Sequence, residues 1–161
     1  MSATDVIPLA VNGTLMRGLE LSGNLLALGA EFDREDQTAP CYRLWSIDDR
    51  HPAMQRVARG GQAIALEIWR IPSLGLARLL LGEPQGLAIG RIVLADGSTV
   101  LGVLAEASLC DGQREITDFG GWRAYCSVNN VPPGQSTEPP PSQSTETALT
   151  DYLETIKPQD A

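Results

Sequence analysis

The stretch RIVLADGSTVLGVLAE, residues 91–106, gives the strongest indication of the fold. Two apolar runs flank the dipeptide Asp96-Gly97. Such a dipeptide favours the tight turn of a hairpin, because glycine adopts the positive φ that the turn needs at no steric cost. The stretch therefore predicts two antiparallel strands.

Further strands are expected on either side of this hairpin. In GGQAIALEIWRIP, residues 60–72, apolar side chains alternate as in a half-buried strand, and Pro72 ends the pattern. One face carries Ile64, Leu66 and Ile68, and the other carries Ala65, Glu67 and Trp69. Residues 6–11 and 38–47 are also rich in strand formers.

Two short helices are expected between these strands. Residues 22–30 suit a helix with Ser22 as its capping residue. Residues 73–84, SLGLARLLLGEP, suit a second helix that stops at Gly82 and Pro84. Together these elements predict an α+β fold, a small mixed β-barrel or curled sheet with short flanking helices.

The composition changes sharply near residue 128, so the folded domain is expected to span residues 1–127. Residues 128–147 are rich in Pro, Ser and Thr and hold too little apolar surface to fold, which predicts a disordered linker. Residues 148–157, ALTDYLETIK, predict a short amphipathic helix. Its apolar face is formed by Leu149, Tyr152, Leu153 and Ile156.

Charge and motifs exclude several classes of function. A net charge of −8 argues against nucleic-acid binding. The chain has neither a signal-peptide pattern nor an apolar run of ~18 residues, so we expect a cytoplasmic protein without membrane contact. The motifs for zinc, phosphate and dinucleotide binding are absent, so no metal or cofactor is expected. Cys41, Cys110 and Cys126 are too widely spaced for a metal pair and are expected to be packing residues.

Three stretches could carry chemistry. In Asn12-Gly13-Thr14-Leu15, successive backbone N–H groups could bind a carboxylate or an oxyanion, although a plain strand-to-helix turn explains the pattern equally well. Glu83 lies at the end of an apolar helix, where burial would raise its pKa and suit it to move protons, although an exposed glutamate in the last turn of a helix is the commoner case.

The third stretch is ITDFGGWRAY, residues 116–125. Gly120-Gly121 lets the backbone approach closely, and Trp122, Arg123 and Tyr125 offer stacking and bidentate donors. A core-closing strand with a bulge is the alternative. The one histidine, His51, is expected in an exposed turn.

Taken in order, VNGTLMRGLELSGNLL, TAPCYRLWSI, GGQAIALEIWRIP, EPQGLAIGRIVLADGSTVLGVLAE and REITDFGGWRAY resemble the C-terminal domain of allophanate hydrolase over residues 6–126. The resemblance implies a γ-glutamylcyclotransferase-like fold. It also implies a role beside amidase chemistry, where this domain is thought to decarboxylate the product of the amidase domain. With no amidase domain in the sequence, we expect a stand-alone relative.

The chain departs from that family at its opening motif. The family segment resembles GAHLSGLPLNHQL. Here Leu15 stands at its first histidine, Ser22-Gly23 replace its Asn-His pair, and Asn24 replaces its glutamine. Asn12-Gly13-Thr14-Leu15 instead resembles the Tyr-Gly-Ser-Leu turn of the cyclotransferases, which binds substrate through backbone amides.

The same resemblance suggests candidate site residues. Glu83 is the candidate for the catalytic glutamate of the cyclotransferases, with Glu67 and Glu106 as rivals. Arg17 and Arg123 are the candidates for pairing a substrate carboxylate.

Two functions follow as hypotheses. In the first, a lyase or acyltransferase acts on a small ureido-carboxylate or γ-glutamyl-like amide in nitrogen metabolism. In the second, a non-catalytic module accompanies a separately encoded amidase. A homodimer is compatible with either hypothesis.

Overall fold

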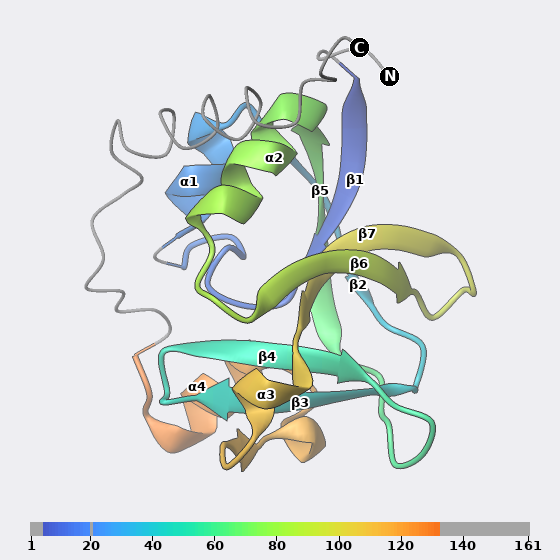
Figure 1. Cartoon of the computed structure of the whole chain (residues 1–161), viewed down its shortest axis with the longest axis vertical. Helices are drawn as coiled ribbons and strands as arrows, with labels where there is room; N and C mark the ends of the chain where they lie inside the picture. The colour runs from blue at the N-terminus through green and yellow to red at the C-terminus, as the bar shows by residue number, and fades with distance from the viewer. Residues whose placement is uncertain (1–4, 20, 133–161) are drawn as a thin grey trace, which may run out of the picture.

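The computed structural model describes residues 5–19 and 21–132 as a mixed α+β fold with two sheets (Figure 1). Its strands are β1 (Val6–Val11), β2 (Glu31–Gln37), β3 (Tyr42–Ile47), β4 (His51–Arg56), β5 (Ala65–Pro72), β6 (Leu87–Val93), β7 (Thr99–Ala105) and β8 (Arg114–Glu115). Its helices are α1 (Ser22–Ala27), α2 (Ser73–Gly82), α3 (Ala107–Cys110), the 3-10 helix η1 (Thr117–Phe119) and α4 (Trp122–Asn129). Figure 1 shows α1 and α2 at one end of the molecule, with α3, α4, β3 and β4 at the other.

The larger sheet has the strand order β2-β5-β1-β7-β6, which places β1 at its centre. β1 pairs antiparallel with β5 along its whole length and parallel with β7 at two positions, Leu9↔Leu101 and Ala10↔Gly102. A Cβ at Gly102 would stand 2.9 Å from the carbonyl oxygen of Ala10 and 2.3 Å from Cδ1 of Ile92. Only glycine lets the two strands come this close.

The larger sheet curls until its two edges meet. Thr38, just past β2, forms an isolated bridge with Leu94, just past β6. The amide of Ala39 donates to the carbonyl of Val93 at 2.9 Å, next to this bridge. Within the described residues the contact between the edges is limited to this point. The expected α+β fold with short flanking helices is confirmed, as a strongly curled sheet rather than a fully closed barrel.

The predicted hairpin is confirmed as β6 and β7. The two strands pair from Leu87↔Ala105 to Val93↔Thr99. Gly97 has a φ of 85°, and the Asp96 carboxylate accepts a hydrogen bond from the Ser98 amide at 2.9 Å. The turn residues therefore have the roles that their chemistry predicts.

Three strands were not expected from the sequence: β2, β4 and the two-residue β8. β2 has the sequence EFDREDQ and forms an edge of the larger sheet, where charged side chains remain in water and discourage pairing with other chains. β4 begins at His51, so the expected exposed turn at this histidine is wrong. The turn lies just before it, at Asp48 and Asp49, which both adopt positive φ. His51 is half-buried, and its Nδ1 lies 3.0 Å from the carbonyl oxygen of Pro52.

The helices at the first end of the molecule largely match expectation. α2 is confirmed, and it ends at Gly82 as predicted. α1 is shorter than the expected 22–30, since Gly29 adopts a φ of 80°. Ser22 is the first residue of α1 and not its cap, because its hydroxyl donates to the carbonyl of Leu19 at 2.9 Å. The expectation of a Ser22 cap was therefore wrong.

The alternative of a core-closing strand over residues 116–125 is also wrong. This stretch forms η1 and the start of α4, with Gly120 in the left-handed region between them. α4 buries Trp122, Tyr125 and Cys126 against the core and continues to Asn129, across the expected boundary at residue 127. A Trp-x-x-Tyr-Cys spacing suits one face of a helix better than one face of a strand.

Cys110 and Cys126 are buried, Cys41 is half-buried, and none forms a disulfide. No helix in residues 5–19 and 21–132 is long and apolar enough to span a bilayer. The expected linker, apart from residues 128–132, and the expected helix at 148–157 lie outside the described residues.

Candidate functional site

The loop that follows β1 packs tightly against β4. The Asn12 side chain is buried, and its amide donates to the carbonyl of Val103 at 3.2 Å. Gly13 does not have a positive φ. A Cβ there would instead stand 2.6 Å from Cδ of Pro52. Gly13 is therefore needed for the close approach of two chain segments, which fixes the position of the loop.

Three successive backbone amides in this loop are left without partners. The loop is closed by hydrogen bonds from the Met16 amide to the Gly13 carbonyl and from the Leu21 amide to the Thr14 carbonyl. The N–H groups of Gly13, Thr14 and Leu15 donate to no described residue, although all three residues are buried. Because buried amides are normally paired, these three form a cradle suited to an oxygen atom that carries negative charge. We call them the amide cradle.

A buried carboxylate holds the far end of this loop. The Glu67 side chain on β5 is 3% exposed, and its Oε2 accepts hydrogen bonds from the Arg17 amide at 2.8 Å and from Nε1 of Trp69 at 3.1 Å. Its Oε1 accepts from Nε of Arg17 at 3.3 Å and from Nη2 of Arg123 at 3.2 Å. Glu67 thus satisfies both of its oxygens with four donors.

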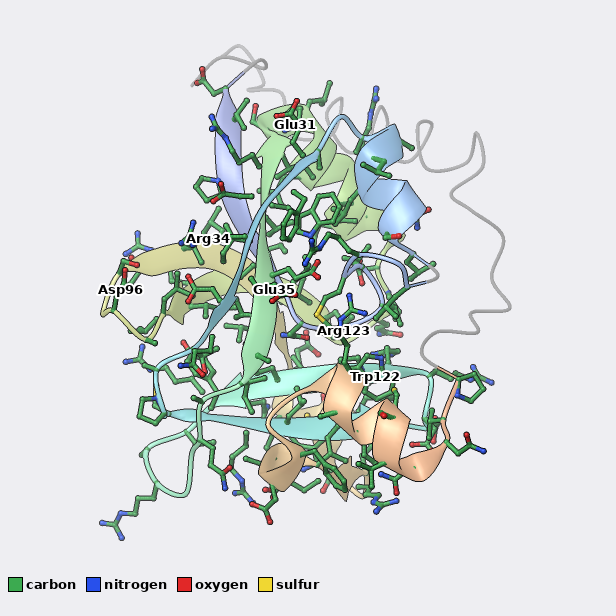
Figure 2. All side chains as sticks on the ribbon, turned by 180° about the vertical axis from the view of Figure 1, so that it is seen from behind. Glu31, Arg34, Glu35, Asp96, Trp122 and Arg123 are labelled. Atoms are coloured by element: carbon green, nitrogen blue, oxygen red, sulfur yellow. The ribbon has the colours of Figure 1, made fainter. Side chains whose placement is uncertain are left out.

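Arg17 and Arg123 form this cluster together with Glu67. Nη2 of Arg123 also donates to the backbone carbonyl of Arg17. Nη2 of Arg17 pairs with Glu35 at 2.9 Å, and its guanidinium lies 3.5 Å from the centre of the Phe32 ring. Figure 2 shows Glu35 and Arg123 beside β5, coming from β2 and α4. Two carboxylates therefore face two guanidinium groups, and the cluster is electrically balanced.

Glu83 lies just past the C-terminal end of α2. Its side chain is half-buried and has no hydrogen bond or ion pair with any described residue. Burial raises its pKa from the ordinary 4.5 to about 7, because the charged form loses hydration without gaining a partner. A carboxyl with this pKa is present in both protonation states near neutral pH.

The expected site residues thus fall into two groups and two single positions. Asn12, Gly13, Thr14 and Leu15 form or flank the amide cradle, where Leu15 contributes its backbone only because its side chain is in the core. Arg17, Arg123 and the rival Glu67 form the buried cluster. Glu83 stands apart, since no described hydrogen bond or ion pair links it to either group. The other rival, Glu106, is exposed at the start of α3.

Sequence reasoning missed two members of the buried cluster. Glu35 lies on β2, a strand that the sequence pattern did not reveal, and Trp69 was assigned only to a strand face. The available signal was Glu67 itself. A carboxylate in the middle of ALEIWRIP shares one face with Trp69, and a buried carboxylate requires donors.

A second polar cluster joins α4 to the turn between β3 and β4. Oδ1 of Asp49 accepts hydrogen bonds from the hydroxyls of Ser46 and Tyr125, each at 2.6 Å. These bonds, first that of Ser46 and then that of Tyr125, hold the pKa of Asp49 below its ordinary value. Burial and the neighbouring carboxylate raise the pKa of the Tyr125 hydroxyl. The cluster fixes α4, and through it Arg123, against the smaller sheet.

Comparison with known proteins identifies relatives that share this fold. A family model of the allophanate hydrolase C-terminal domain matches residues 7–127. A uropathogenic Escherichia coli-specific protein of known structure is 58% identical with a TM-score of 0.75, over 79% of this chain and 98% of that chain. Allophanate hydrolase from Kluyveromyces lactis is 27% identical with a TM-score of 0.73, over 78% of this chain and 22% of that chain.

Urea amidolyase from Saccharomyces cerevisiae is 29% identical over an alignment of 126 positions, and the match covers 74% of this chain. The chain spans 7% of the length of the curated relatives that it matches. More distant structures share the fold alone, among them an AIG2-like protein from Mus musculus at 16% identity and a TM-score of 0.51. The fold is γ-glutamylcyclotransferase-like, and the match over residues 7–127 shows that the chain belongs to the family of allophanate hydrolase C-terminal domains.

Proposed function

We propose that this domain binds a small ureido-carboxylate or γ-glutamyl-like amide at the amide cradle and acts on it as a lyase or acyltransferase in urea and nitrogen metabolism. The observation that carries the proposal is that the N–H groups of three buried residues, Gly13, Thr14 and Leu15, have no acceptor among the described residues. Amides held in this way stabilise an oxygen whose negative charge grows during reaction. The relatives named urea amidolyase and allophanate hydrolase support this substrate class.

Glu83 is the proposed proton carrier. In a decarboxylation, its protonated carboxyl gives a proton to the substrate nitrogen as the C–N bond breaks and carbon dioxide leaves. In a cyclotransfer, its carboxylate takes a proton from the attacking amine and returns it to the departing one. A pKa of about 7 suits both directions of transfer.

Arg17 and Arg123 are proposed to pair the substrate carboxylate through the N–H groups that Glu67 and Glu35 leave unused. Both guanidinium groups are nearly half exposed, at 44% and 47% of their side-chain surface. They remain fixed by Glu67 on their inner side. Their geometry is therefore set before any ligand arrives, which reduces the entropy lost on binding.

The test is to replace Glu83 with Gln and to assay carbon dioxide release from an N-carboxylated urea derivative and oxoproline release from a γ-glutamyl amide. We expect loss of turnover of about 100-fold or more, since general acid–base catalysis contributes that much. The matched control is Glu106→Gln, because Glu106 is exposed. Unchanged turnover in Glu83→Gln would remove this residue from the mechanism.

Binding is tested separately by titration with malonate, a dicarboxylate that mimics the substrate. We expect the 15N-amide signals of residues 13–15 to shift on titration. If those signals stay fixed while others move, the amide cradle is not the binding site.

The absence of the family histidines favours a second function, that of a non-catalytic module of a separately encoded amidase. Leu15 and Gly23 supply no imidazole at the two positions where the family motif has histidine. The two functions differ in a simple assay. An accessory module turns over neither substrate alone but co-purifies with the amidase, whereas an enzyme turns over its substrate without any partner.

A further inference from the structure

The helix α2 is apolar on its outer face as well as on the face that meets the core. Its sequence SLGLARLLLG has Arg78 as its one charged residue. Gly75 and Leu79 are buried, whereas Leu74 and Leu81 are 40% and 41% exposed. A helix that is apolar all round is normally covered on every side. The outer face of α2 therefore indicates a missing neighbour.

The helix α1, which contacts α2, also has an exposed leucine. Its Leu26 is 62% exposed. The two helices touch, since a Cβ at Gly75 of α2 would stand 2.9 Å from the carbonyl of Leu28, the C-cap of α1. Figure 1 shows both helices at the same end of the molecule. We call Leu26, Leu74, Leu80 and Leu81 the exposed leucine face.

We propose that residues 148–157 of the same chain dock on the exposed leucine face. The sequence of this segment places four apolar side chains on one side of a helix. A ten-residue helix is about 15 Å long, the same length as α2, which also has ten residues. So short a helix is marginal in water and gains stability by burying its apolar side.

The length of the connecting chain and the charge of residues 148–157 suit this docking. Residues 133–147 can span about 50 Å when extended, which exceeds the diameter of about 35 Å expected for a domain of this size. Figure 1 shows α4 at the opposite end of the molecule from α1 and α2, and a chain of this length can reach from one end to the other. The segment carries Asp151, Glu154 and Lys157, so its net charge is −1, and Arg78 of α2 has the complementary charge.

The experiment compares three full-length proteins by hydrogen–deuterium exchange: the native chain, Leu153→Asp with Ile156→Asp, and the control Thr150→Asp with Thr155→Asp. Both variants add two negative charges to the segment, but only the first places them on its apolar side. We expect α1 and α2 amides to exchange about fivefold faster, or more, in the first variant than in the native chain. The control should match the native chain.

Equal exchange in all three proteins would overturn the proposal. Protection of α2 that is lost on dilution would also overturn it, because a second copy of the chain would then cover the leucines. A reciprocal variant, Leu74→Gln with Leu81→Gln, changes the exposed leucine face instead of the tail. In this variant the amides of residues 148–157 should exchange hydrogen for deuterium faster than in the native chain. If this variant does not fold, the comparison of the two double variants within residues 148–157 is sufficient to test the proposal.

Discussion

The carboxylate of Glu67 accepts a hydrogen bond from the backbone amide of Arg17 at 2.8 Å, across 50 residues of sequence. The bond joins the centre of β5 to the loop that follows β1. Arg123 also donates a hydrogen bond to the carbonyl of Arg17. Both the N–H and the C=O group of Arg17 are therefore held by side chains. The conformation of the amide cradle thus depends on a side chain that lies outside it.

Replacing Glu67 with Gln should destabilise the fold by about 2 kcal/mol, because two guanidinium groups lose their shared carboxylate and one oxygen becomes an amide nitrogen. Chemical denaturation measures this effect. Glu106→Gln, at an exposed site, should change the free energy of unfolding by less than about 0.5 kcal/mol. Equal effects of the two substitutions would show that the cluster contributes nothing to stability.

Replacing Gly13 with Ala should cost about 1–3 kcal/mol, because the new Cβ would overlap the Pro52 ring, which cannot rotate away. Gly23→Ala in α1 is the matched control, since its Cβ would enter open space. That control should be neutral, or stabilising by up to about 1 kcal/mol through helix propensity. The thermal midpoint of Gly13→Ala should therefore lie below that of the native chain, whereas the midpoint of Gly23→Ala should be equal to it or higher.

Glu83 should make stability fall as the pH rises. Its folded pKa of about 7 lies above the unfolded 4.5, so the folded protein holds this proton more tightly. Destabilisation begins near pH 4.5 and is complete above pH 7. Glu83→Gln should therefore be more stable than the native chain above pH 7, by roughly 1–2 kcal/mol after allowance for partial exposure, and equal to it near pH 4. A difference that does not depend on pH would contradict the raised pKa.

Ser46 should influence the pKa of Asp49 more than Tyr125 does. Both hydroxyls donate to the same carboxylate oxygen, but the Ser46 bond is the larger cause of the lowered pKa. NMR titration should show a larger upward shift in Ser46→Ala than in Tyr125→Phe. The carboxylate stabilises the fold above its unfolded pKa near 3.8, and this contribution is lost as the pH falls through the lower folded value. The reverse order of shifts would refute this assignment.

Local patterns were sufficient to predict part of the fold. The hairpin of β6 and β7, the strand β5 and the helix α2 each carry their own signal in alternation, turn residues or helix-ending residues. β2 carries no such signal, because an edge strand can be almost wholly polar. For α4 the sequence pattern offered a bulged strand as its structural alternative, because a Gly-Gly pair suggests a bulge, whereas Gly120-Gly121 precedes a helix.

Only part of the candidate site could likewise be predicted from local sequence patterns. The Asn12-Gly13-Thr14-Leu15 turn could be identified because its chemistry lies in consecutive residues. The buried cluster could not, since Glu67 meets Arg17 across 50 residues and Arg123 across 56. Pairings of that kind are decided by how the strands are ordered in the sheet.

The position of β1 at the centre of the larger sheet also has a consequence for synthesis. β1 leaves the ribosome before the other described strands of this sheet, yet Leu101, the parallel partner of Leu9, is made 92 residues later. At translation rates of about 5–20 residues per second, the edge of β1 that pairs with β7 remains unpaired for on the order of 5–20 s. The nascent chain must keep an apolar strand from aggregating during this interval, which makes it a candidate client for ribosome-associated chaperones.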